Sequence, residues 1–146
     1  MFNIVKFDPA YRDDTIFCVL LAQEELGRIP ELRADLLGIQ TSYFDKGDMF
    51  WVAIDKNGRV VGTLGTQKVS ETEMWLKRFF IKPSFKRQGL GSGLLGVAEQ
   101  YAILEGITHI HTRFAEDFLE APLFYHSKGF TEFKRAGKMI HLIKKL

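Results

Sequence analysis

Apolar and polar residues change their spacing several times along the chain, and each change predicts a new element. Residues 2–7 mix apolar and β-branched side chains, which predicts a strand. Asp8 and Pro9 then give a helix-start signal, because aspartate caps free N–H groups and proline suits a first turn. Apolar residues at helical spacing follow until Gly27, and a second helix is predicted over residues 30–44.

The middle of the chain changes to the spacing of β-strands. Residues 49–54 form an apolar run, the Asp-Lys-Asn-Gly stretch at 55–58 is typical of a hairpin turn, and residues 59–69 form the return strand. A further strand is predicted over residues 73–81. Its continuous apolar end predicts burial on both faces.

The last third of the chain alternates helices and strands. A helix is predicted over 91–105, a strand over 107–114, a short helix over 119–129, and two final strands over 130–133 and 138–146. The element order is β-α-α-β-β-β-α-β-α-β-β, which predicts an α/β (α+β) fold with a mixed sheet. The length of 146 residues predicts a single domain over residues 1–146.

Composition excludes several classes of protein. With 20 basic and 18 acidic residues the net charge is only +2, which gives no argument for a nucleic-acid partner. The single cysteine, Cys18, cannot form an internal disulfide, and no metal-ligand spacing is present. No apolar run approaches the ~20 residues of a membrane span, and the first residues lack the core of a signal peptide. We therefore expect no metal, no membrane association and a cytoplasmic location.

The basic residues are clustered, and the cluster lies directly before a glycine-rich helix start. Five basic residues and no acidic one fall between Lys77 and Gln88, and Gly89, Gly91 and Gly93 follow. Helix N-termini carry free N–H groups and partial positive charge, and glycine lets a ligand approach the backbone closely. The segment therefore predicts a phosphate-binding turn.

Two well-known phosphate motifs fit poorly here. A Walker A loop requires Gly-Lys-Ser/Thr, which is absent. The dinucleotide pattern G-x-G-x-x-G is present at residues 91–96, but a basic segment separates it from the preceding strand, which such a motif must follow directly. We therefore favour a turn of the form strand, proline, basic segment, Gly-x-Gly, helix.

This segment resembles the diphosphate-binding motif of the GNAT superfamily of acyl-CoA-dependent N-acetyltransferases. In that motif a hydrophobic strand end and x-Pro lead to (Q/R)-x-x-G-x-(G/A), and residues 86–91 match it, with Lys86 in place of the usual Gln or Arg. Residues 121–130, APLFYHSKGF, resemble the later motif A-x-x-F-Y-x-x-x-G-F of the same family. The order of elements is also similar over essentially the whole chain.

The resemblance implies a fold, a cofactor and a reaction. The fold would be a mixed, mostly antiparallel sheet of about six or seven strands flanked by about four helices. The reaction would transfer an acetyl group from acetyl-CoA to a primary amine of a small molecule or peptide, by direct attack in a ternary complex. The cofactor-binding residues implied are Phe79, Phe80 and Ile81 for the pantetheine arm, and Lys86, Arg87, Gln88, Gly89, Leu90, Gly91, Ser92 and Gly93 for the diphosphate.

The resemblance also implies catalytic roles. Tyr125 matches the tyrosine that serves as general acid in many members, and a phenol stays protonated at neutral pH. Glu73, at the start of its strand, is the first candidate for general base. His109 and His111 share one face of the next strand and are candidates for a proton relay.

Other interpretations remain open. The chain could be a non-catalytic acyl-CoA-binding or regulatory module of the same fold, or a dinucleotide-dependent oxidoreductase. Among acceptors, an amino acid, a polyamine, an aminoglycoside and a protein terminus are not distinguished by the sequence. A homodimer is possible, with the apolar strand around residues 139–143 as an exposed edge.

Overall fold

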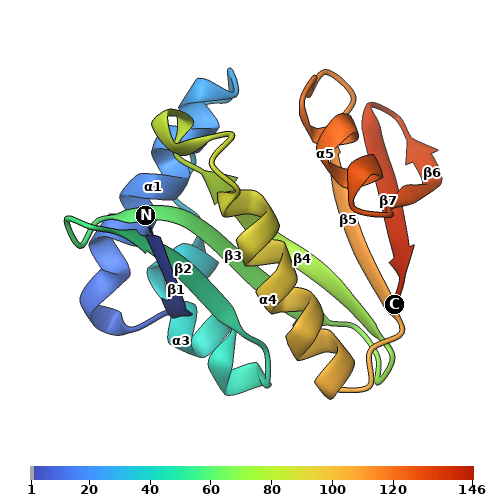
Figure 1. The fold of residues 1–146 in the computed structure, drawn as a ribbon, viewed down its shortest axis with the longest axis horizontal. Helices are drawn as coiled ribbons and strands as arrows, with labels where there is room; N and C mark the ends of the chain where they lie inside the picture. Colours follow the sequence, from blue (N-terminus) through green and yellow to red (C-terminus); the bar gives the residue numbers. More distant parts are fainter. Residues whose placement is uncertain (1) are drawn as a thin grey trace.

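The computed structural model of the protein describes residues 2–146 and contains seven strands, five α-helices and three short 3-10 helices in that range (Figure 1). The order along the chain is β1 (Phe2–Lys6), η1 (Pro9–Tyr11), α1 (Arg12–Glu25), α2 (Ala34–Leu37), α3 (Ile39–Ser42), η2 (Phe44–Lys46), β2 (Phe50–Asp55), β3 (Val60–Lys68), β4 (Glu73–Ile81), η3 (Pro83–Phe85), α4 (Leu90–Leu104), β5 (His109–Ala115), α5 (Ala121–Ser127), β6 (Thr131–Ala136) and β7 (Met139–Lys145).

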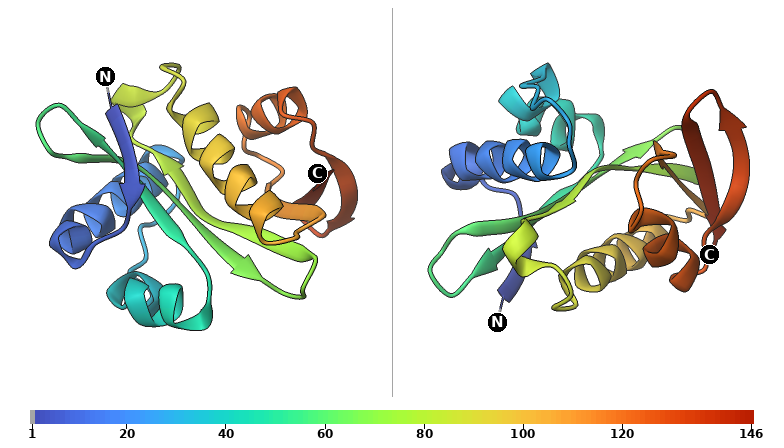
Figure 2. Two further views of the ribbon diagram at one scale, coloured as in Figure 1. Left: turned by 60° about the horizontal axis from the view of Figure 1, so that its bottom comes forward. Right: turned by 90° about the horizontal axis from the view of Figure 1, so that it is seen from above.

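All seven strands join one sheet in the order β1-β2-β3-β4-β5-β7-β6. Every neighbouring pair is antiparallel except β4 and β5, which run parallel. Figure 2 shows α4 and α5 on one face of the sheet, while α1, α2 and α3 lie on the opposite face over its β1–β4 half. The predicted mixed, mostly antiparallel α/β fold is confirmed.

The β4–β5 pair is short, and this decides where a cleft can form. Its pairing runs only from Glu73 with His109 to Trp75 with His111. Beyond that point β4 continues to Ile81 without β5 beside it, and β5 continues along β7. The two strands therefore separate in the middle of the sheet, as Figure 1 shows between β4 and β5.

Two apolar clusters hold the helices on the sheet. The larger one packs Leu94, Leu95 and Ala98 of α4 against strand residues such as Met74 and Ile110. The smaller one joins α1 and α3 to the other face through residues that include Cys18, Ile39, Phe50 and Val52. The buried side chains of α4 recur at helical spacing, which is the pattern that predicted this helix.

The prediction of one helix over residues 30–44 was wrong. Two single-turn helices, α2 and α3, occupy part of this range, and they meet at Gly38, whose φ of −135° and ψ of 70° are not helical. Glycine has a low helix propensity and permits such a break. Leu36 and Tyr43 are buried, whereas Leu32 is 53% exposed and Leu37 47% exposed.

Two predictions about strands were also wrong. Phe79, Phe80 and Ile81 are not buried on both faces but half-buried, because β5 has left β4 at this level. The apolar strand β7 is not an edge of the sheet, since it lies between β5 and β6.

Within residues 2–146, no helix combines the length and apolar character that crossing a bilayer requires.

Candidate active site

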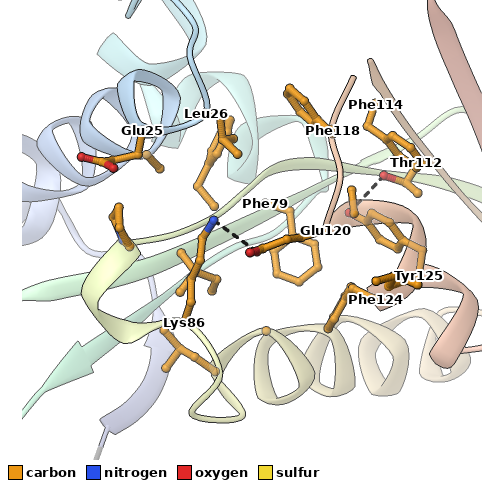
Figure 3. A pocket seen from close by; sticks show the side chains of 18 of the residues that line it. Glu25, Leu26, Phe79, Lys86, Thr112, Phe114, Phe118, Glu120, Phe124 and Tyr125 are labelled. Atoms are coloured by element: carbon orange, nitrogen blue, oxygen red, sulfur yellow. Dashed lines mark hydrogen bonds and ion pairs between the residues drawn. The ribbon is translucent and has the colours of Figure 1, made fainter. Parts of the chain in front are cut away.

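A cavity of about 800 Å³ opens where β4 and β5 separate. Its walls come from the end of β4, the segment that leads into α4, the middle of β5, the loop after β5, and α5. Figure 3 shows Phe79, Phe124 and Tyr125 on one side of it and Lys86 on another, with Leu26 at the end of α1 above. The two sequence motifs, which lie about 30 residues apart, thus form walls of one cavity.

The glycine-rich turn exposes the first amides of α4 to this cavity. Arg87 and Gly89 adopt left-handed conformations, with φ of 65° and 80°. This turn ends at α4, and the first N–H groups of a helix have no acceptor within it. Leu90, Gly91 and Ser92 line the cavity, so these donors lie beside it. Successive amides in such a turn form a concave anion-binding surface.

Gly91 and Gly93 matter for packing rather than for backbone conformation. A Cβ on Gly91 would lie 3.3 Å from the Phe124 ring, a tight contact, so glycine lets this aromatic wall approach closely. A Cβ on Gly93 would lie 3.1 Å from Ile4 in the interior. Gly93 does not line the cavity, and neither does Gln88. The Gln88 side chain instead donates to a backbone carbonyl at 3.4 Å.

Two cations flank the turn and face a carboxylate. Lys86 Nζ lies 3.6 Å from a carboxylate oxygen of Glu120 across the cavity (Figure 3). An Arg87 guanidinium nitrogen lies at the same distance from the other carboxylate oxygen. Exposed pairs at this separation contribute little, about 0–1 kcal/mol. Both cations are therefore available to an anionic ligand in the cavity.

The end of β4 offers an unpaired backbone edge to the cavity. Phe79, Phe80 and Ile81, the residues predicted to bind a pantetheine arm, all line the cavity. The register between β3 and β4 shifts near this point, and Arg78 has a positive φ of 53°. Thr63 Oγ1 fixes this irregularity by donating to the Arg78 carbonyl at 2.7 Å. A bulge of this kind turns the strand and redirects its backbone groups.

Tyr125 lies at the inner end of the cavity and is only 8% exposed. Its ring stacks on Phe114 with centroids 5.9 Å apart and packs edge-on against Phe130. Thr112 Oγ1 donates to the Tyr125 hydroxyl oxygen at 3.4 Å, which leaves the phenolic proton free to be donated (Figure 3). Burial raises the pKa of Tyr125 to about 12, so the phenol is protonated at neutral pH.

Glu73 lies outside the cavity, at the start of β4. Its carboxylate is 2.7 Å from His111 Nε2, and His111 Nδ1 is 2.9 Å from His141 Nε2. His109 is not part of this chain of contacts, because its ring nitrogen bonds the Thr108 hydroxyl instead. The structure therefore joins Glu73 to one of the two predicted relay histidines and adds His141, which the sequence analysis missed.

His141 is a member of this chain because of strand pairing. It lies on β7 opposite Arg113 of β5, and β7 alternates it with the buried Ile140 and Leu142. Burial lowers the pKa of His141, and the nearby His111, Lys134 and Arg113 lower it further. Neutral His141 is thus the dominant form near pH 7. The alternation of buried and less buried residues along β7 was the available sequence signal for His141. It did not show which strand lies beside β7.

A second missed feature joins the end of α1 to the loop after β5. Arg28, just after α1, donates two hydrogen bonds to Asp117 in the loop after β5, and its guanidinium lies 4.5 Å from the Phe118 ring centroid. The two residues are 89 positions apart, so no local pattern connects them. This ion pair links the two walls of the cavity.

Comparisons with known proteins agree with this geometry. An acetyltransferase (GNAT) domain family matches residues 46–132. Human N-acetyltransferase 8 is 30% identical over 113 residues, which cover 73% of this chain but 48% of the human protein. The chain therefore spans about half the length of that relative.

Solved structures share the whole fold. A GNAT-family acetyltransferase from Staphylococcus aureus Mu50 superposes with a TM-score of 0.91 at 25% identity, covering 100% of this chain and 99% of the other. The PaiA N-acetyltransferase from Thermoplasma acidophilum, solved in complex with coenzyme A, gives a TM-score of 0.82 at 17% identity, covering 100% and 99%. With the family match over more than half of its length, the chain belongs to the GNAT family of acetyltransferases.

Proposed function

We propose that this protein transfers the acetyl group of acetyl-CoA to a primary amine of a small molecule or peptide, by direct attack in a ternary complex. The observation that carries the proposal is the cavity between β4 and β5. It has an anion-binding helix start at one end and a protonated, buried phenol at the other. The coenzyme A complex of the related PaiA fold and the name of the human relative support it.

The diphosphate would be bound by backbone amides of the turn over residues 86–93, chiefly those of Leu90, Gly91 and Ser92 that line the cavity. Lys86 and Arg87 would exchange their long contacts with Glu120 for charge-assisted hydrogen bonds to phosphate oxygens. The diphosphate affinity is then partly electrostatic and falls as salt concentration rises.

The pantetheine arm carries two amides and needs peptide-like partners. The free edge of β4 at Phe79, Phe80 and Ile81 supplies backbone donors and acceptors in the manner of strand addition. A main-chain N–H of this segment would also polarise the thioester carbonyl as negative charge develops on its oxygen. The rings of Phe79 and Phe124, edge-on with centroids 5.8 Å apart, give this part of the cavity an apolar wall.

Tyr125 would protonate the departing sulfur. The amine nitrogen forms a bond to the carbonyl carbon, the carbon–sulfur bond breaks, and the electron pair stays on sulfur. The phenolic proton, which is not used in the contact with Thr112, would move to that sulfur. The raised pKa keeps the phenol protonated before the step, so the proton is present when the sulfur departs.

Glu73 would act as base through its two histidines. The attacking amine must be neutral, and the nitrogen must lose a further proton once the bond to carbon has formed. Glu73 does not line the cavity, so the proton would reach it along His141 and His111, whose separations of 2.9 and 2.7 Å suit transfer. Water would complete the path from the amine to His141.

The proposal is tested by ligand binding and by thiol release. Acetyl-CoA should raise the melting temperature whereas NAD should not, and free thiol should appear when a screened amine is added. Stabilisation by NAD alone would contradict the proposal and favour an oxidoreductase. Tight binding of acetyl-CoA without thiol release on any amine would instead indicate a non-catalytic acyl-CoA-binding module.

A further inference from the structure

Two cations converge on Trp75 where β4 and β5 separate. Lys77 Nζ lies 5.9 Å and Arg113 Cζ 5.8 Å from the Trp75 ring centroid. Trp75 pairs with His111 in the last rung between the two strands. Side chains alternate along a strand, so Lys77 and Arg113 are the next residues on the same face, one on each diverging strand.

This face of the sheet is the one opposite α4 and α5. The alternate residues Met74 and Leu76 of β4 are buried in the cluster beneath α4, which leaves Trp75 and Lys77 on the other side. Figure 2 shows that, among the described residues, α1–α3 cover only the β1–β4 half of this side. Arg113 also lines the cavity, so it joins the open face to the proposed thioester site.

Neither cation has an acidic partner in the part of the chain that the structure describes. The other cations of the site do have one: Arg78 pairs with Asp35 at 2.6 Å, and Arg28 pairs with Asp117. Within residues 2–146, no carboxylate oxygen lies within 4 Å of a charged nitrogen of Lys77 or Arg113.

In the absence of an anion, the positive charges of Lys77 and Arg113 repel each other. Burial lowers the pKa of Lys77, and the neighbouring charge of Arg113 lowers it further. The nearest acid that acts on Lys77, Asp35, already accepts hydrogen bonds from Arg78 at 2.9 and 2.6 Å and from the Tyr43 hydroxyl at 2.7 Å. A carboxylate bound between Lys77 and Arg113 would remove their mutual repulsion.

We infer that Lys77 and Arg113 bind the carboxylate of the acceptor, and that the substrate is an amino acid or a small amine carrying a carboxylate. This inference rests on the proposed acetyl transfer. The guanidinium of Arg113 can bind a carboxylate through two parallel hydrogen bonds, and Lys77 adds a point charge. Both cations lie within about 6 Å of the Trp75 ring centroid, at the outer limit of cation–π contact.

The placement fits the chemistry of the transfer. Acetyl-CoA would lie on the α4 side of the gap between the strands, and the acceptor carboxylate on the opposite side. An amine close to that carboxylate then points into the gap, where the thioester carbonyl would be. The same two cations repel polyamines and aminoglycosides, which carry several positive charges.

The test compares each common L-amino acid with its carboxamide, and adds spermidine, in a thiol-release assay with acetyl-CoA. An amino acid and its carboxamide differ in the negative charge of the carboxylate, and both have the amine. We expect the best amino acid to exceed its carboxamide in kcat/KM by about 10- to 100-fold, the range of a charge-assisted contact. Lys77→Met and Arg113→Gln should each reduce this preference, and Lys56→Met, in the exposed β2–β3 turn, should leave it unchanged.

The outcomes separate this inference from the proposed function. Thiol release that is equal with carboxamides, or fastest with spermidine, overturns the inference and leaves acetyl transfer intact. If no acceptor gives thiol release, the proposal of acetyl transfer fails. The inference about Lys77 and Arg113 is then tested by calorimetry, which measures the affinities of amino acids and carboxamides for the coenzyme A complex. Tighter binding of amino acids than of carboxamides by the wild type, lost in Lys77→Met, supports the site, whereas equal affinities overturn it.

Discussion

Replacing Tyr125 with phenylalanine removes one oxygen from the proposed site and little else. The stacking on Phe114 and the edge contact with Phe130 involve the ring and are retained. The hydroxyl is held within the protein by one long contact from Thr112, at 3.4 Å. We therefore expect Tyr125→Phe to cost no more than about 1 kcal/mol of folding free energy, a change of roughly 3 °C in the melting temperature.

The effect on turnover should be much larger. A well-placed general acid contributes about 10²- to 10⁴-fold, so kcat should fall at least ~100-fold. The dissociation constant for acetyl-CoA should change little, because its charged part would be bound at the start of α4, away from the phenol. Steady-state thiol-release assays measure kcat, and calorimetry measures the dissociation constant for acetyl-CoA.

The pH dependence sharpens this prediction. Because burial raises the pKa of Tyr125 to about 12, the wild-type phenol stays protonated from about pH 7 to pH 9, and the ratio of the two rates should be constant there. Tyr101→Phe is the matched control, since Tyr101 lies on α4 outside the cavity and donates to the Gly47 carbonyl. A Tyr125→Phe rate within about threefold of the wild type, well below the expected loss, would refute the general-acid role.

Three further changes test the turn and the stability of the fold. Gly89→Ala places a side chain at a φ of 80°, which costs about 1–2 kcal/mol, so both urea stability and acetyl-CoA affinity should fall, and unchanged values would contradict the proposed turn geometry. Lys86→Met should weaken acetyl-CoA binding and reduce its salt dependence, measured by calorimetry at two ionic strengths, whereas Lys56→Met should do neither. Burial, and then the hydrogen bond to Asp35, raise the pKa of Tyr43. The contribution of this phenol to the free energy of unfolding is therefore complete below about pH 10. It declines as the pH rises further, by up to ~1.4 kcal/mol per pH unit. Tyr43→Phe should therefore flatten the loss of urea stability between about pH 10 and 11, and an unaltered slope would exclude this phenol as its source.

The helix start at α4 could be predicted from the sequence because its signals are local. The glycines, the basic residues and the apolar spacing after them lie within one short segment, and backbone geometry translates them directly into a turn and a helix. The same is true of the β2–β3 hairpin, where Asp55 Oδ1 accepts from the Asn57 and Arg59 amides within the predicted turn. Tyr125 was identified differently, through the resemblance of residues 121–130 to a family motif that covers α5 and the residues just after it.

Failures arose where a local pattern had two solutions. Residues 30–44 have enough apolar side chains for a helix, but the non-helical backbone at Gly38 divides them into two separate turns. The apolar end of β4 predicts burial equally well against a strand or against a ligand cavity. Which of these holds depends on where β5 leaves β4, and that is not encoded in β4 alone.

The sequence by itself indicated most of the elements, the glycine-rich turn before α4 and the position of the Tyr125 phenol. Only the tertiary structure decided which distant residues meet: Arg28 with Asp117, His111 with His141, and Lys77 with Arg113 around one tryptophan. The physical reason is that helices and turns are stabilised by contacts between near neighbours in the chain, whereas strand pairing joins segments whose register depends on the whole sheet. The place where β4 and β5 part is such a register effect, and it creates the cavity.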